Sequence, residues 1–271
     1  MSSRREPGHA VQQCVSVRRG RQPAARRDIV NRGPDSLGCI RMVLDCVGNG
    51  AGAICPGNHE MRLAYMIDAP HRLDDVSHYC DAASLATLRG ELARNPGGIG
   101  LVRAFADLLR ETPIWRTLGG ATFCHAAMPG ELRGMAAPLL GGVARGDDPV
   151  LDMVLWGQRQ VPGGQPVYDW VDSVPGGEAV FVGHHPVSLT HPVRVTGRHG
   201  GIAVLCDTGC GIHDGRGRLS ALELDFRDLE DVAGARQVLD LEEAPVVMTL
   251  RPGREMASIW LQAHSGAPAQ L

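Results

Sequence analysis

Five consecutive residues, Pro-Gly-Asn-His-Glu at positions 56–60, carry the side chains of this chain best suited to chemistry. They follow a short apolar run, residues 51–55, and precede a helical pattern of apolar residues, which predicts a strand, a glycine turn and a helix start. The amide oxygen of Asn58 suits a hard divalent cation, and the His59 imidazole can give or take a proton near neutral pH. An isolated Asn-His pair is more often a capping Asn beside a surface His. The interpretation therefore depends on the residues that follow.

Apolar runs and helical periodicities alternate along the chain without repeats, which predicts strands interleaved with helices. Helices are expected over residues 36–47, 83–94 and 100–110, and strands at 122–125, 179–184, 202–207 and 218–224. Three of these strands end in polar residues, His125, His184 and Asp207, so we expect one edge of a sheet to carry chemistry. Residues 126–178, rich in Gly and Pro, predict a long excursion that covers the site.

Composition excludes several classes of protein. The 271 residues carry a net charge of −3, so nucleic acid is not indicated as a partner. Residues 1–27 are rich in arginine and lack periodicity; we interpret them as a basic irregular tail or a wrongly assigned gene start, with a nucleic-acid arm as the alternative. Neither a secretory signal nor a membrane span is expected.

The eight cysteines form no C-x-x-C pair, and most lie in apolar runs, which predicts reduced thiols in a cytoplasmic protein. A zinc site at Cys206, Cys210 and His213 is the less favoured alternative, because a fourth ligand at useful spacing is missing.

The candidate residues form a consistent set when taken in chain order: Asp28, Asn31, Arg32, Asn58, His59, His125 and His184. One carboxylate, one amide oxygen and two histidines suit a divalent transition metal such as Mn, Fe or Zn. Each residue alone has a simpler explanation, such as a surface carboxylate or a satisfied core imidazole. Their joint order favours a metal site.

That order resembles the calcineurin-like metallophosphoesterase superfamily, in its serine/threonine-phosphatase-type branch. Residues 28–36 are similar to the segment G-D-x-x-D-R-G-P-D-S, and residues 56–60 match G-N-H-E. Residues 123–127 resemble a strand ending in H-A-G, residues 182–186 resemble G-H-T-P, and residues 206–210 with 217–222 resemble the closing strands. The resemblance covers about residues 28–226. It is nearest to phosphatase modules of bacterial polynucleotide kinase-phosphatases and to diadenosine-tetraphosphatase-like enzymes.

The resemblance implies an α/β fold, a two-sheet β-sandwich flanked by helices, over residues 28–250, followed by a C-terminal tail at 251–271. It also implies hydrolysis by in-line attack, with two metal ions about 3.5–4 Å apart that clamp the attacking and leaving oxygens. Manganese is the expected metal, with Fe or Zn as alternatives.

Site roles carried over from the family fall into three groups. Metal ligands would be Asp28, which bridges the two metals, with Asn58, His125 and His184. The phosphate would be held by Arg32 and Arg159, and His59 would give a proton to the leaving group while Asn31 orients it. Glu60 and Asp207 would lie in the layer of residues around the ligands.

The chain departs from the family at its first motif, G-D-x-H-G, which holds the first metal. The most similar segment is Glu-Pro-Gly-His at residues 6–9, where Pro7 occupies the position of the motif's Asp. Arg27 replaces a Gly, and Asn31 replaces the Asp that orients the proton-donating His. The first metal site is therefore in doubt, and the N-terminal strand is expected to be missing or irregular.

Three functions remain open on these residues. The first is a phosphomonoesterase of protein-phosphatase type, acting on phosphorylated proteins or nucleotides, with activity impaired by the missing motif. The second is hydrolysis of dinucleoside polyphosphates or of nucleic-acid phosphate ends. The third, from another class, is a catalytically inactive protein that binds phosphate or metal.

Overall fold

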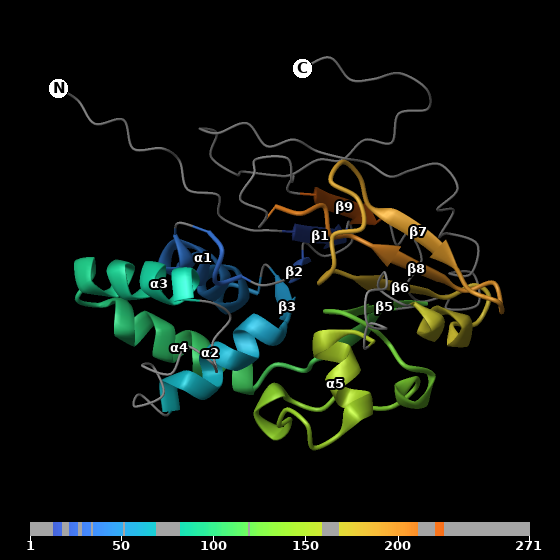
Figure 1. Ribbon diagram of the computed structural model, residues 1–271, viewed down its shortest axis with the longest axis horizontal. Helices are drawn as coiled ribbons and strands as arrows, with labels where there is room; N and C mark the ends of the chain where they lie inside the picture. The colour runs from blue at the N-terminus through green and yellow to red at the C-terminus, as the bar shows by residue number, and fades with distance from the viewer. Residues whose placement is uncertain are drawn as a thin grey trace, which may run out of the picture.

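The computed structural model describes residues 13–17, 22–26, 29–33, 35–50, 52–68, 82–118, 120–158, 168–210 and 220–224. It has an α/β fold with two β-sheets and a group of helices beside them, which confirms the predicted fold class (Figure 1). Asp28, Arg159, His213 and the predicted tail at 251–271 lie outside the described residues. The domain limits expected from the sequence stay a prediction.

The first sheet has four strands in the order β3 (Ala53–Cys55), β2 (Gln22–Arg26), β1 (Gln13–Val17) and β9 (Ser220–Leu224). Strands β1 and β2 are antiparallel, whereas β1 with β9 and β2 with β3 are parallel. The register pairs Val15 with Leu222 and Ala25 with Ile54. The N-terminal segment thus supplies the two central strands of this sheet.

The expectation of a missing or irregular N-terminal strand is therefore wrong. Within residues 13–17 only Val-Ser-Val at 15–17 alternates apolar and polar types, which is the period of a strand but too short a run to predict one. Residues 22–26, Gln-Pro-Ala-Ala-Arg, have little strand propensity of their own. Their strand depends on pairing with β1 on one side and β3 on the other, which no local pattern reveals.

The second sheet has five strands in the order β4 (Trp115–Leu118), β5 (Ala121–Cys124), β6 (Ala179–Val182), β8 (Ile202–Leu205) and β7 (Val193–Thr196). The three central strands β5, β6 and β8 are parallel, so their carboxyl ends meet at one edge, as the sequence predicts. Every residue of β5 and β6 is buried, as expected for apolar runs inside a sheet. The edge strands β4 and β7 are antiparallel to their neighbours, and the sequence did not predict them.

Four helices lie together beside the sheets: α1 (Ser36–Gly48), α2 (Asn58–Asp68), α3 (Ala82–Arg94) and α4 (Gly98–Arg110) (Figure 1). Three of them begin and end within two residues of the predicted helices, and α2 begins at the predicted helix start. The buried face of α4 includes Phe105 and Leu109, which are fully inaccessible to solvent. None of the described helices combines the length and apolar character needed to cross a membrane.

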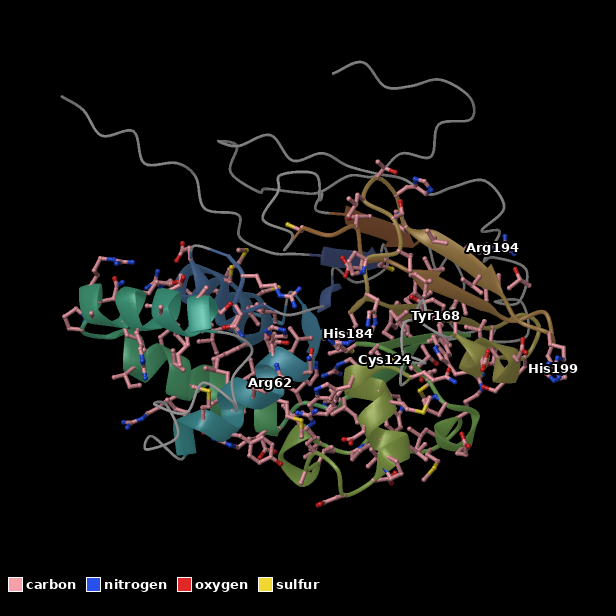
Figure 2. All side chains as sticks on the ribbon, in the orientation of Figure 1. Arg62, Cys124, Tyr168, His184, Arg194 and His199 are labelled. Carbon is pink, nitrogen blue, oxygen red and sulfur yellow. The ribbon has the colours of Figure 1, made fainter. Side chains whose placement is uncertain are left out.

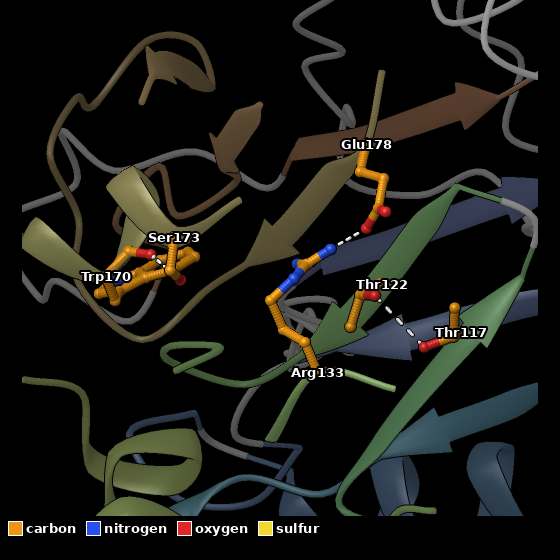
Figure 3. Close-up of polar contacts among 6 residues, drawn as sticks. All are labelled: Thr117, Thr122, Arg133, Trp170, Ser173 and Glu178. Carbon is orange, nitrogen blue, oxygen red and sulfur yellow. Dashed lines mark hydrogen bonds and ion pairs between the residues drawn. The ribbon is translucent and has the colours of Figure 1, made fainter. Parts of the chain in front are cut away.

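The excursion at 126–178 contains helix α5 (Pro149–Trp156) and three short 3-10 helices, η3 (Gly130–Leu132), η4 (Leu140–Gly142) and η5 (Asp169–Ser173). Its glycines and prolines concealed α5, which begins at a capping Asp148 whose carboxylate accepts from two backbone N–H groups. An ion pair joins Arg133, near the beginning of the excursion, to Glu178, its last residue, which directly precedes β6 (Figure 3). Close to it, the Ser173 hydroxyl donates to the Trp170 carbonyl over 2.7 Å.

Four of the cysteines whose side chains the structure describes are buried: Cys39, Cys55, Cys124 and Cys206. Burial raises the pKa of Cys39 to about 12, so this thiol stays protonated. The Cys55 thiol donates to the Phe123 carbonyl over 3.3 Å, and Arg116 Nε donates to the Ile54 carbonyl over 3.2 Å. These two bonds connect β3 of one sheet to β4 and β5 of the other.

Candidate active site

Three predicted ligands converge where two strands end and one helix begins. His125 follows β5, His184 follows β6, and Asn58 opens α2. His125 Nε2 lies 3.0 Å from Oδ1 of Asn58 and 2.9 Å from Nδ1 of His184. Figure 2 places His184 in the middle of the molecule, between the helix group and the five-stranded sheet. Residues 58, 125 and 184, widely separated in sequence, thus share one site.

Gly57 makes room for this cluster. A Cβ atom at this position would lie 2.6 Å from both Cε1 and Nδ1 of His125, far inside normal contact distance. The backbone N–H of Gly57 donates to Oε2 of Glu60 over 2.9 Å, which closes the turn between β3 and α2. A side chain at position 57 would displace the His125 ring from its partners.

His184 has a left-handed backbone conformation with φ of 69°, which is uncommon for a non-glycine residue. The N–H of His185 donates to the Gly183 carbonyl over 2.9 Å, so His184 is the central residue of a γ-turn. The N–H of Gly183 donates to the His125 carbonyl over 2.7 Å. This turn holds two of the candidate ligands at a fixed separation at the cost of local strain.

The second group of site residues surrounds His59. Nδ2 of Asn31 lies 2.8 Å from Nδ1 of His59, and both residues are buried. Asn31 and Arg32 also have left-handed backbones, with φ of 75° and 57°. The Gly33 N–H donates to the Asn31 carbonyl over 2.7 Å, so Arg32 is the centre of a second γ-turn. Its side chain is exposed at this turn.

Glu60 is fully buried and binds backbone groups. Its Oε1 accepts from the N–H of Ile29 over 2.5 Å and from the N–H of Val30 over 3.2 Å. The carboxylate therefore ties the segment before Asn31 to the start of α2. Asp207, also buried, accepts from the N–H of Gly209 over 2.6 Å and so shapes the turn after β8.

The donor set fits a divalent transition metal. Oδ1 of Asn58 and Nδ1 of His184 both lie within 3.0 Å of Nε2 of His125, and this mixture of one amide oxygen and two imidazole nitrogens suits Mn, Fe or Zn. In the part of the chain that the structure describes, no group of three His, Cys, Asp or Glu residues forms a metal site. The set thus depends on the neutral oxygen of Asn58. The predicted bridging ligand Asp28 and the predicted phosphate ligand Arg159 lie outside the described residues.

Two serines that contact the site residues were not predicted from the sequence. Oγ of Ser36 accepts from the Asn31 N–H over 3.4 Å, and Oγ of Ser84 accepts from the Arg32 N–H over 3.1 Å. Ser36 closes the motif segment at 28–36, so its position was a signal that could have been used. Ser84 lies 52 positions from Arg32, and no motif points to it.

No protein-family model matches the chain. The chain is 29% identical over 213 residues to PrpE of Bacillus subtilis (strain 168), an asymmetrical bis(5′-nucleosyl)-tetraphosphatase, with 75% of this chain and 77% of the relative covered. Diadenosine-tetraphosphatase-like enzymes are one of the two groups of enzymes that the motifs of this chain resemble. The similarity therefore supports the superfamily resemblance.

Proposed function

We propose that this protein is a metal-dependent phosphoester hydrolase of the calcineurin-like metallophosphoesterase superfamily, and that it acts on dinucleoside polyphosphates. The observation that carries the reaction class is the convergence of Asn58, His125 and His184. The substrate class rests on the similarity to an asymmetrical bis(5′-nucleosyl)-tetraphosphatase.

Asn58, His125 and His184 would hold a divalent metal, with manganese as the expected ion. When bound, such an ion supplies Lewis-acid polarisation of a phosphate oxygen and lowers the pKa of water. The protein contributes a rigid ligand set, because a γ-turn fixes His184 and the absence of a side chain at Gly57 leaves space for the His125 ring.

Arg32 and His59 would act on the substrate itself. The exposed guanidinium of Arg32 is suited to hold two phosphate oxygens at once. The side-chain amide of Asn31 contacts Nδ1 of His59 and orients the ring, so Nε2 would be the nitrogen that acts on the leaving group. The protonated ring would pass its Nε2 proton to the oxygen of the leaving group and become a neutral imidazole. An Asn at position 31 supplies this orientation without the negative charge of the family's Asp.

Two other functions remain candidates, each for a specific reason. The phosphomonoesterase expected first from the motifs stays a prediction, because the comparison favours the dinucleoside polyphosphate alternative. A catalytically inactive protein that binds phosphate or metal is the second candidate, because the G-D-x-H-G motif that holds the family's first metal is absent from the sequence.

The deciding experiment incubates the purified full chain and Mn with diadenosine tetraphosphate or with p-nitrophenyl phosphate. We expect unequal cleavage of the dinucleotide into a triphosphate and a monophosphate. His59→Ala should lower kcat by about 10²- to 10⁴-fold, the usual contribution of a positioned acid. His191→Ala, an exposed histidine outside the site, is the matched control. Turnover of p-nitrophenyl phosphate alone would favour the phosphomonoesterase, and no turnover of either would favour the inactive protein.

A further inference from the structure

The turn that carries Arg32 is held from outside by α3. The Arg32 N–H donates to Oγ of Ser84 over 3.1 Å, and Ser84 is only 6% exposed. Arg32 has a φ of 57°, and such a left-handed backbone is sterically unfavourable for a non-glycine residue. A strained residue keeps this conformation only when its surroundings impose it. The Ser84 hydroxyl is therefore one of the groups that stabilise the turn.

A second side chain of α3 holds the residues that follow the turn. Glu91 lies two helical turns after Ser84, on the same face of the helix. Its carboxylate accepts from the N–H groups of Ser36 and Leu37, over 3.0 and 2.8 Å. One rigid helix thus holds both ends of the segment between Arg32 and α1.

The residue before Arg32 contacts the histidine proposed as the proton donor. The preceding residue, Asn31, contacts Nδ1 of His59 over 2.8 Å. The Cα atoms of adjacent residues are about 3.8 Å apart, so a change in the Arg32 backbone is passed to this contact. One short segment of main chain thus carries both the exposed guanidinium and the Asn31 amide that contacts His59.

We propose that Ser84 is a positioning residue, which fixes the main chain of Arg32 so that its guanidinium meets the substrate phosphate. This inference rests on the proposed function, since it takes Arg32 as the phosphate ligand. Ser84 lies outside every segment that carries the family resemblance, and its role follows from the contact with the Arg32 N–H alone.

The experiment compares Ser84→Thr with Ser84→Val, which differ only in a hydroxyl for a methyl group. We expect Ser84→Val to raise KM for diadenosine tetraphosphate by about fivefold to tenfold relative to Ser84→Thr, the effect of one hydrogen bond. The thermal midpoints of the two variants should stay close. Thr87→Val, which removes a hydroxyl bonded within α3 to the Ala83 carbonyl, is the control. If neither bulky variant folds, Ser84→Ala gives the same comparison against wild type.

A double-mutant cycle separates positioning from general loss of stability. In an Arg32→Ala background, Ser84→Val should change KM no further, because its effect passes through Arg32. Equal KM values for the Thr and Val variants, or additive effects in the cycle, would overturn the inference. If the wild type hydrolyses neither substrate, the proposed function fails, and binding of inorganic phosphate decides the inference. Weaker binding to Ser84→Val than to Ser84→Thr would support it, and equal binding would overturn it.

Discussion

His184 and Arg32 are two of the residues at which this protein stores backbone strain beside its candidate site. Each is the centre of a γ-turn closed by a hydrogen bond between its two neighbours, His185 to Gly183 and Gly33 to Asn31. Glycine would adopt either conformation without a steric cost, yet the chain places an imidazole and a guanidinium there. The strain is consistent with side chains that are retained for binding and not for stability.

At position 184 this predicts an unusual order of stability. The free energy of unfolding of His184→Gly should be about 1 kcal/mol higher than that of His184→Ala. Both variants lose the imidazole, but only glycine adopts the positive φ without strain. Urea unfolding of the metal-free variants measures the difference. At Arg194, exposed in strand β7, the order should reverse, with Ala about 0.5–1 kcal/mol more stable than Gly. Equal free energies of unfolding for the alanine and glycine variants at position 184 would contradict the claim that this backbone is strained.

At the scale of elements, the start of α1 is capped twice. Asp35 accepts from the Gly38 N–H over 2.8 Å, and Glu91 reaches across from α3 to the N–H groups of Ser36 and Leu37. These bonds satisfy donors that an α-helix leaves open in its first turn. Burial raises the pKa of Glu91 above its ordinary value of 4.5, although the bonds from Leu37 and Ser36 lower it. The carboxyl group that caps α1 is therefore harder to ionise in the folded protein than in the unfolded chain.

The sign of the resulting pH dependence follows from linkage. The folded protein binds the Glu91 proton more tightly than the unfolded chain does. The free energy of unfolding therefore falls as the pH rises from 4.5 through the folded pKa. In Glu91→Gln this decline is absent, so the stability of the variant relative to wild type should increase across that window. Urea unfolding at several pH values between about 4 and 7 measures it. Glu111→Gln, at an exposed position after α4, controls for the lost charge, and a constant difference for Glu91→Gln would refute the prediction.

At the scale of the whole molecule, the site draws on both sheets and on the helix group. His125 and His184 come from the five-stranded sheet, while Asn58 begins α2 directly after β3 of the four-stranded sheet. A ligand held by all three parts stabilises only the folded arrangement. Metal binding should therefore be visible in global unfolding as well as in activity.

Mn at a hundredfold excess over its Kd should raise the thermal midpoint of the wild type by about 5–10 °C. Gly57→Ala should abolish this rise, because its Cβ would lie 2.6 Å from two atoms of the His125 ring. Gly100→Ala in α4, where a Cβ meets nothing within 4 Å, should keep it. A rise in Gly57→Ala equal to that of wild type would place the metal elsewhere, and elemental analysis of the loaded protein would give the number of ions per chain.

The sequence by itself determined the elements whose residues repeat with a local period. The apolar spacing of α1 and α4 and the apolar runs of β5, β6 and β8 predicted those elements and the shared edge of their strands. The order of the motifs was enough to nominate Asn58, His125 and His184, because each follows a strand or opens a helix. The predictions of these helices and strands succeed because a helix face or a buried strand is encoded by neighbours in sequence.

Only the tertiary structure decided the rest. The pairing of β2 between β1 and β3, the left-handed backbones of Arg32 and His184, and the bond from Arg32 to Ser84 leave no local pattern. Each depends on contacts between distant segments, whose packing energy outweighs the propensity of the residues involved. A weak strand former becomes a central strand when partners flank it on both sides. A strained histidine or arginine stays in place when hydrogen bonds from elsewhere in the fold hold the residues around it.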